Sequence, residues 1–466
     1  HYYIEKDEFR RAENGDVQVV VGRKGSGKTT LFARLRDRLR RHRNRIVLDL
    51  QPQGFQLIKF KERVLRLMEE GTKDHTVAAF WEYLLLLEIA YKLLDNDRLP
   101  HTRNHELFQP YRALEARYAT AEYAAHGDFA ERMQWLVDSL CERVCKHSSK
   151  PGQLQFTSAK LTEILYQHDI NKLREEIFSY LAMKDGLWIL VDNLDKGWPA
   201  AGLGSDDLVM IRSLIDAINH LRVAVAKRDV PCNGVVFLRN DVFELLVEYT
   251  PDRGKVSHAV IDWTDPDELR EMPRRRFVYN GLPLETKFAD VWATVCVSHV
   301  AGEESSQYLI DRCLMRPRGL IDLFNHCRSH AVNLGKAKID ANDFAHGEEM
   351  FSTDLVHNIG YELRDVFPKA ADALYELIES PRRISKADAV GRFSKLGLSE
   401  DEINELIRLL LWYGVLGLVR EGDTVTYIHN VKYDMKRLQA LVGKVEADKL
   451  RFEINPAFWR GLEVKA

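Results

Sequence analysis

Apolar residues are arranged in two ways along the chain, and the difference predicts its secondary structure. Several short, nearly continuous apolar runs predict strands that are buried on both faces, as in a parallel sheet. These runs occupy residues 17–21, 45–50, 187–191, 234–238 and 259–263. Leu31, Leu35 and Leu39 instead lie on one stripe of a helix predicted over residues 30–41. Such strands, interspersed with helices, predict an α/β core.

The remaining pattern is mostly helical. Trp81, Leu84, Leu85 and Glu88 show helical spacing, and the whole segment 55–185 predicts a large helical insertion between the second and third strands. Lys150-Pro151-Gly152 marks a break within it. An arginine-containing helical region begins at Pro266. Its further helices are predicted over residues 284–300, 305–315 and 320–334.

The last part of the chain carries the signals of a small mixed module. A helix is expected within residues 365–380, and capping boxes at Ser385-x-x-Asp388 and Ser399-x-x-Glu402 open two more. Two apolar segments around Glu421-Gly422-Asp423 predict a hairpin. Three helices and a hairpin favour a winged helix, and the apolar peptide 452–459 is expected to pack back onto it.

The segment between the first strand and the first helix carries the strongest chemical signal. It reads Gly22-Arg23-Lys24-Gly25-Ser26-Gly27-Lys28-Thr29, followed by Thr30. In this G-x-x-x-x-G-K-[ST] pattern, glycines let successive backbone N–H groups face phosphate oxygens. Lys28 can reach the β- and γ-phosphates, and the Thr29 hydroxyl can ligate Mg²⁺. The order strand, loop, helix favours a nucleotide site over a tight glycine turn with a surface lysine.

A second candidate lies where the run 187–191 leads into Asp192-Asn193-Leu194-Asp195. A carboxylate at the carboxyl edge of a parallel strand can hold Mg²⁺, usually through water. A turn-capping Asp would give the same local pattern. Downstream of a phosphate loop, however, we interpret the segment as a Walker B strand with Asp192 as its acid.

Three arginines are further candidates. Arg239 follows the strand over 234–238, so it is expected on the γ-phosphate side of the cleft; an ion pair with Asp241 is an equally favoured alternative. Arg316 and Arg318 flank Pro317 at a predicted helix start, where a phosphate could join them.

These signals predict an α/β P-loop core with a parallel sheet and a large helical insertion, followed by a helical lid and a winged helix. The predicted domains are the core over residues 1–54 and 186–265, the insertion over 55–185, the lid over 266–355, the winged helix over 356–440 and a C-terminal tail over 441–466.

Composition adds weaker constraints. The formal net charge of −3 gives no overall attraction to nucleic acid or acidic lipid. Six scattered cysteines favour a reducing cytoplasm, and Cys141, Cys145 and His147 are better explained by core packing than by a metal. No signal peptide or membrane span is expected, and the start at His1 is compatible with a fragment of a longer protein. The arginine-rich stretch 34–45 could bind nucleic acid, but a solvated helix face is favoured.

The order of these motifs resembles that of AAA+-like and STAND-type ATPases, including archaeal origin-recognition proteins. The stretch 191–198 looks most like bacterial STAND-like ATPases that are often encoded in anti-phage loci. The resemblance implies that Lys28 and Thr29 bind phosphate and Mg²⁺, that Arg239 occupies a sensor 1 position, and that Arg316 or Arg318 occupies a sensor 2 position. AAA+ hydrolases carry Glu directly after the Walker B Asp. This chain has Asn193 there and Asp195 two residues further on, which predicts slow hydrolysis.

The resulting hypothesis is an ATP/ADP-controlled switch that forms homo-oligomers and acts on an attached or partner effector. The alternative is an origin-recognition-like ATPase that binds DNA, and a metabolic NTPase or kinase is a weaker third. The helix that begins at Ser399 carries four carboxylates within residues 400–405, so duplex DNA is not expected to bind through it.

Overall fold

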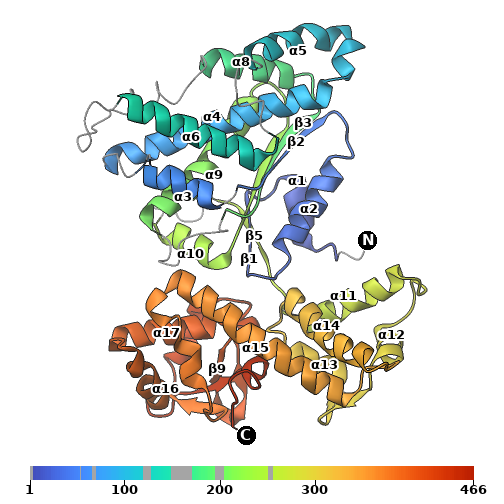
Figure 1. Cartoon of the computed structure of the whole chain (residues 1–466), viewed down its shortest axis with the longest axis vertical. Coiled ribbons are helices and arrows are strands. Elements are labelled where there is room, and N and C mark those ends of the chain that lie inside the picture. The colour runs from blue at the N-terminus through green and yellow to red at the C-terminus, as the bar shows by residue number, and fades with distance from the viewer. Residues whose placement is uncertain are drawn as a thin grey trace.

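The computed structural model describes residues 4–52, 54–63, 65, 70–118, 127–147, 170–194, 204–249 and 256–465. The core and its helical insertion lie at one end of the molecule, whereas the later helices and a C-terminal module lie at the other (Figure 1). The long helix α15 (Ala341–Val366) runs between the last two parts.

A five-stranded parallel sheet forms the core, as predicted. Its strands, in the order β2-β3-β4-β1-β5, are β2 (Arg45–Leu50), β3 (Gly186–Val191), β4 (Cys232–Leu238), β1 (Val19–Gly22) and β5 (His258–Ile261). Each pairing is parallel, so all five carboxyl ends lie at one edge. β4 separates β1 from β3, an arrangement that the sequence pattern does not specify.

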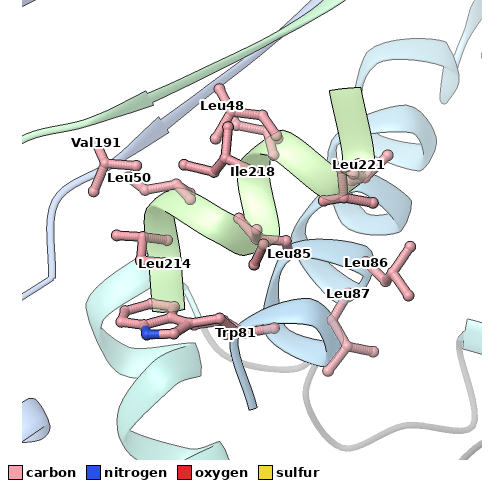
Figure 2. Close-up of a cluster of buried hydrophobic side chains, with 14 of the residues drawn as sticks. Leu48, Leu50, Trp81, Leu85, Leu86, Leu87, Val191, Leu214, Ile218 and Leu221 are labelled. Carbon is pink, nitrogen blue, oxygen red and sulfur yellow. The ribbon is translucent and has the colours of Figure 1, made fainter. Parts of the chain in front are cut away.

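Helices cover both faces of this sheet, which explains the continuous apolar runs. Val20, Trp188 and Phe237 pack with α1 (Asp7–Asn14) and α2 (Lys28–Leu39) on one face. The alternate strand residues pack on the other face with α4 (Glu70–Asp97) and α9 (Ser205–Ala226). Leu48, Leu50 and Val191 there lie beside Leu214 and Ile218 of α9, and Leu85 of α4 packs on the other side of α9 (Figure 2). Before the first strand, Phe9 and Ala12 are buried and anchor α1 against the sheet.

The insertion is helical, as predicted. Within the described ranges its helices are α3 (Gly54–Arg63), α4, η2 (Pro100–Thr102), α5 (His105–Tyr118), α6 (Phe129–His147) and α8 (Ile170–Leu181). Trp81 on α4 donates a hydrogen bond to the carbonyl of Met210 on α9 at 2.9 Å and so fixes the insertion to the core. The break predicted at residues 150–152 lies outside the described residues. Cys141 is buried in this core, in agreement with the packing interpretation; the side chains of Cys145 and His147 are outside the description.

The helical region after the core starts where the sequence predicts it but differs in detail. After α10 (Asn240–Tyr249) and β5 come α11 (Pro266–Tyr279), α12 (Phe288–Val295), β6 (His299–Val300), β7 (Glu303–Glu304), α13 (Ser305–Asp311), α14 (Pro317–Asn333) and α15. The helix predicted over 284–300 is confined to α12, and a two-stranded hairpin follows it. The boundary predicted between residues 355 and 356 falls inside α15, whose buried apolar residues continue to Leu363. The helix expected within 365–380 is replaced by the end of α15 and two 3-10 turns, η4 (Pro368–Ala370) and η5 (Ala373–Leu377).

Residues 383–465 form what we call the C-terminal module. Its further elements are β8 (Arg383–Ser385), α16 (Lys386–Phe393), η6 (Ser394–Leu396), α17 (Glu400–Tyr413), β9 (Leu416–Val419), η7 (Glu421–Asp423), β10 (Val425–Thr426), η8 (Ile428–Val431), α18 (Met435–Val442), β11 (Arg451–Ile454) and η9 (Pro456–Phe458). Both predicted capping boxes are present, and β9 and β10 form the predicted hairpin.

The end of the chain is an integral part of this module. The expected packing of the apolar peptide 452–459 is confirmed, because β11 pairs with β9 and with β8 near the middle of a four-stranded sheet. Ser352 of α15 donates a hydrogen bond to the carbonyl of Ala457 at 2.7 Å and accepts one from the amide of Gly461 at 2.8 Å. The module is therefore attached to the middle of α15. Among the helices of the described ranges, none has the length and apolar character that a membrane crossing requires.

Candidate nucleotide-binding site

The loop between β1 and α2 has the conformation that its glycines predict. Gly25 and Gly27 adopt left-handed backbone angles, with φ of 83° and 104°, which favour glycine. A β-carbon at Gly22 would lie 2.4 Å from the Ser26 hydroxyl. Gly27 caps α2 without a side-chain hydrogen bond, so the first-turn N–H groups of this helix face the loop as a positive site for an anion.

Lys28 lies across this loop. Its ammonium donates hydrogen bonds to the carbonyls of Gly22 at 2.6 Å and Arg23 at 3.2 Å. Thr29 and Thr30 are exposed on the first turn of α2, and Lys24 is exposed on the loop itself. The cation and the hydroxyls needed for a Mg²⁺-bound phosphate chain thus lie together at the carboxyl edge of the sheet.

Asp192 directly follows β3 at the same edge and is only 2% exposed. Its backbone amide donates to the carbonyl of Leu50 at 3.0 Å, which fixes the end of the strand. Asn193 has a left-handed φ of 66°, so the chain turns sharply there. Asp195 lies outside the described residues. Thr29 and Asp192 offer oxygen ligands, and Mg²⁺ sites typically combine one or two carboxylates with phosphate and water. The donor set therefore fits Mg²⁺.

The side chain of Arg23 is buried against the C-terminal module and the residues before α14. It is 6% exposed, and its guanidinium lies 3.9 Å from the centre of the Tyr433 ring and donates a hydrogen bond to the Tyr433 hydroxyl. Longer contacts of 3.4 Å join it to the carbonyls of Leu314 and Met315. Burial lowers the pKa of Arg23. Arg23 was predicted to bind nucleotide; its side chain contacts Tyr433 of the C-terminal module, and its backbone lies in the loop.

Two more loop residues are held from outside the sheet. The indole N–H of Trp263, just after β5, donates to the carbonyl of Ser26 at 2.9 Å. The amide of Arg318 on α14 donates to the carbonyl of Gly25 at 3.3 Å. The Tyr433 hydroxyl also donates to the carbonyl of Trp263 at 3.1 Å, which joins these contacts into one network. The sequence pattern gave no indication of Trp263 or Tyr433.

Arg239 forms the ion pair that the sequence left open. Its guanidinium binds both oxygens of Asp241, at 2.5 and 3.0 Å, and a carboxylate oxygen of Asp365 on α15 at 3.4 Å.

Arg316 and Arg318 occupy different environments. Arg316 is 6% exposed and contacts Glu362 on α15 at 3.2 Å through one terminal nitrogen. Its Nε and its other terminal nitrogen have no hydrogen-bond partner among the described residues. The Arg318 side chain is exposed, although its backbone touches the loop. Arg316 is thus a buried cation whose donors are not fully used.

A cavity of about 440 Å³ opens beside the loop. It is lined by Gly27 and Thr30, by Trp263 after β5, and by Arg276 of α11 and Pro317 of α14. This volume suits a small organic ligand or a nucleoside. The sheet, the loop and the flanking helices together have the arrangement that the sequence predicts for a P-loop core.

Comparison with known proteins gives two sequence matches. A model of the FunZ-associated C-terminal helical domain matches residues 267–360, which run from α11 through most of α15. An Escherichia coli K12 protein named for transposon gamma-delta and its mass of 80.3 kDa is 23% identical over 378 residues. The match covers 78% of this chain and 50% of that protein, so this chain spans about half the length of its relative.

Three solved structures show a distant likeness. The Walker-type ATPase of Pyrococcus abyssi is 12% identical, with 93% of this chain and 96% of that chain covered and a TM-score of 0.41. The ORC2 protein of Aeropyrum pernix is 11% identical, with 96% and 87% covered and a TM-score of 0.31. Cdc6p of Pyrobaculum aerophilum is 10% identical, with 94% and 96% covered and a TM-score of 0.32. At these scores the likeness supports no functional conclusion about this chain.

Proposed function

We propose that this chain is an ATP-binding molecular switch in which the nucleotide state controls the position of the C-terminal module. One observation carries the proposal: the phosphate-loop residue Arg23 is held by Tyr433 of that module, 410 positions later in the chain. A ligand that reshapes the loop must change this contact, and a difference in contacts between two states is what a switch requires.

In this proposal the loop amides and Lys28 bind the phosphate chain, while Thr29 and Asp192 hold Mg²⁺ directly or through water. The metal would neutralise phosphate charge when bound. The 440 Å³ cavity between the loop and helices α11 and α14 would receive the nucleoside. Trp263 would then be affected by both the nucleoside and the phosphate chain, because it lines the cavity and binds the loop.

Hydrolysis is proposed to be slow, below the ordinary enzyme range of about 1–1000 per second. Asn193 follows Asp192 and carries no carboxylate that could polarise a water molecule. Asp195 is the proposed substitute. Slow hydrolysis suits a switch, because the ATP-bound state must persist long enough to be read by a partner.

The wider role is proposed from the resemblance to STAND-type ATPases: ATP-dependent homo-oligomerisation that activates an attached or partner effector, in bacterial anti-phage defence. The C-terminal module is taken as a winged helix that binds protein. Its α17 carries Glu400, Asp401 and Glu402 in the first turn, and its second half is buried. An acidic first turn is unfavourable next to DNA phosphates.

Calorimetry with ATP and ADP tests the nucleotide site. Lys28→Ala should weaken ATP binding by roughly one to two orders of magnitude, because hydrogen bonds to charged groups contribute about 1.5–3 kcal/mol. Lys24→Ala is the matched control, since Lys24 is an exposed lysine of the same loop. Equal affinities for the parent protein and both variants would rule out this site.

A DNA-associated ATPase is the second candidate. The relative named for a transposon favours it, as do Arg40, Arg41 and Arg43, which are exposed in the turn between α2 and β2. Fluorescence anisotropy with random duplex at low salt distinguishes the candidates. Sub-micromolar binding that is lost on Arg41→Ala and Arg43→Ala would favour this function over the protein-binding switch.

A further inference from the structure

Two of the arginines predicted to sense phosphate are held by the same helical turn. Arg316, at the start of α14, contacts Glu362 at 3.2 Å, and Arg239, after β4, contacts Asp365 at 3.4 Å. Glu362 and Asp365 are three residues apart near the end of α15, so they lie on one face of this helix. Arginines from two separate parts of the chain therefore meet carboxylates of a single element.

That element is tied firmly to the C-terminal module. The carbonyl of Glu362 accepts a hydrogen bond from the Tyr413 hydroxyl at the end of α17, at 3.3 Å. Further back, Ser352 bonds the chain at Ala457 and Gly461. Any displacement of the last turn of α15 is thus shared with the module, whose position the proposed switch would control.

The pair between Arg316 and Glu362 is also incomplete. Both side chains are nearly inaccessible, at 8% and 5% exposure, yet only one nitrogen of the guanidinium reaches the carboxylate. The other nitrogens have no partner among the residues described, and Arg23 lies near enough to add a like charge. A buried arginine with unused donors gains from an anion that accepts more than one hydrogen bond.

We propose that Glu362 is a positioning residue that restrains Arg316 and thereby lowers the affinity of the site for ATP relative to ADP. The proposal rests on the nucleotide switch described above. Without a γ-phosphate, Arg316 stays on Glu362 and α15 stays against the core. A γ-phosphate competes with Glu362 for Arg316, and the release frees the last turn of α15 together with the module. Asp365 adds a weaker restraint on Arg239, because its side chain is 40% exposed and Asp241 binds the same guanidinium at shorter distances.

The restraint has a measurable consequence for affinity. ATP must detach Arg316 from Glu362. The apparent ATP affinity is therefore the intrinsic affinity multiplied by the fraction of molecules in which Arg316 is free. ADP, which lacks the γ-phosphate, is not subject to this reduction. Glu362→Gln should therefore raise the ratio of ATP to ADP affinity by about tenfold, within the usual range of coupling between sites. The rise should disappear when Arg316→Ala is added.

The same helix supplies a matched control. Glu348 is also buried on α15, and it pairs with a different arginine, Arg312, at 3.1 Å. Glu348→Gln removes a buried carboxylate from an arginine in the same way, so it should lower stability while leaving the affinity ratio unchanged. A ratio that rises equally in both variants would mean that the effect is a general loosening of α15.

The experiment is a titration of the full chain with ATP and with ADP, by calorimetry, in the parent, Glu362→Gln, Arg316→Ala, the double variant and Glu348→Gln. A ratio unchanged by Glu362→Gln, or raised equally in the presence of Arg316→Ala, overturns the proposal while leaving the nucleotide site intact. If the parent protein binds neither nucleotide, the proposed function falls first. Should Glu362→Gln fail to fold, Asp365→Asn replaces it, with a smaller rise expected that requires Arg239.

Discussion

Buried arginines in the described part of the chain make two kinds of contact. One kind is a complete ion pair that stabilises the fold, and the other leaves hydrogen-bond donors that a ligand could use. In the insertion, Arg132 makes two hydrogen bonds of 2.7 Å to the two oxygens of Glu88 and lies over the Tyr91 ring at 3.9 Å. Beside the phosphate loop, Arg316 reaches Glu362 with one nitrogen, and Arg23 has contacts of 3.4 Å to carbonyls together with its bond to Tyr433.

The difference shows where the chain has spare hydrogen-bonding capacity. A bidentate pair balances the loss of hydration of both charges and holds two helices in one arrangement. An arginine with unused buried donors is less stable where it lies and responds to an added anion. We therefore expect the insertion to be insensitive to nucleotide and the region between the loop, α15 and the C-terminal module to respond to it.

Replacing Arg132 by Met should have the largest effect on stability. It leaves Glu88 as a buried charge without its bidentate partner, which lowers the free energy of unfolding by about 3–5 kcal/mol. Urea denaturation measures the free energy of unfolding with and without ATP. The decrease caused by Arg132→Met should be the same in both conditions. Arg316→Met is the comparison: it should destabilise the free protein less but remove most of the added stability that ATP provides. An ATP-dependent loss in the Arg132 variant would contradict the contrast.

A smaller effect is expected at the contact between the loop and the module. Tyr433→Phe keeps the ring that faces Arg23 but removes the hydroxyl that binds both Arg23 and Trp263, a loss of about 1–3 kcal/mol in local stability. Hydrogen exchange of residues 22–27 should become faster in the free protein. Tyr361→Phe is the control, because Tyr361 also lies beside an arginine, Arg364, but is exposed. Unchanged exchange in Tyr433→Phe would show that the module does not hold the loop.

The smallest predicted effect is a pH dependence at the same junction. Asp262 lines a cavity of about 420 Å³ between the core and the module, and burial raises its pKa from 3.8 to about 6. Because the folded state binds this proton more tightly, the carboxyl contributes stability at low pH that is lost as pH rises from about 4 to about 6. Asp262→Asn should therefore raise the melting temperature at pH 7.5 but hardly at pH 4.

The control for the pH prediction is Asp448→Asn, an exposed position of the C-terminal module. It should shift the melting temperature little at either pH. An Asp262→Asn variant that is stabilised equally at both pH values would show that the substitution acts through shape or packing rather than through the proton.

Local patterns in the sequence determined much of this protein. Apolar runs identified all five core strands, since a strand covered on both faces needs an apolar residue at nearly every position. The loop sequence predicted the loop conformation, because Gly25 and Gly27 adopt left-handed backbone angles that favour glycine. The boxes at Ser385 and Ser399 identified two helix starts, because each satisfies backbone groups only three residues away.

Only the tertiary structure decided which distant residues meet. The loop motif predicts that Arg23 lies next to phosphate, and only the structure shows that its side chain contacts Tyr433. The motif order predicts that Arg239 and Arg316 face a nucleotide, and only the structure shows that Arg239 binds Asp241 and Asp365 and that Arg316 contacts Glu362. The physical reason is the distance along the chain over which each interaction acts. Strand and helix patterns depend on neighbours within a few residues. The partner of a buried charge is whichever opposite group the fold brings within hydrogen-bond distance.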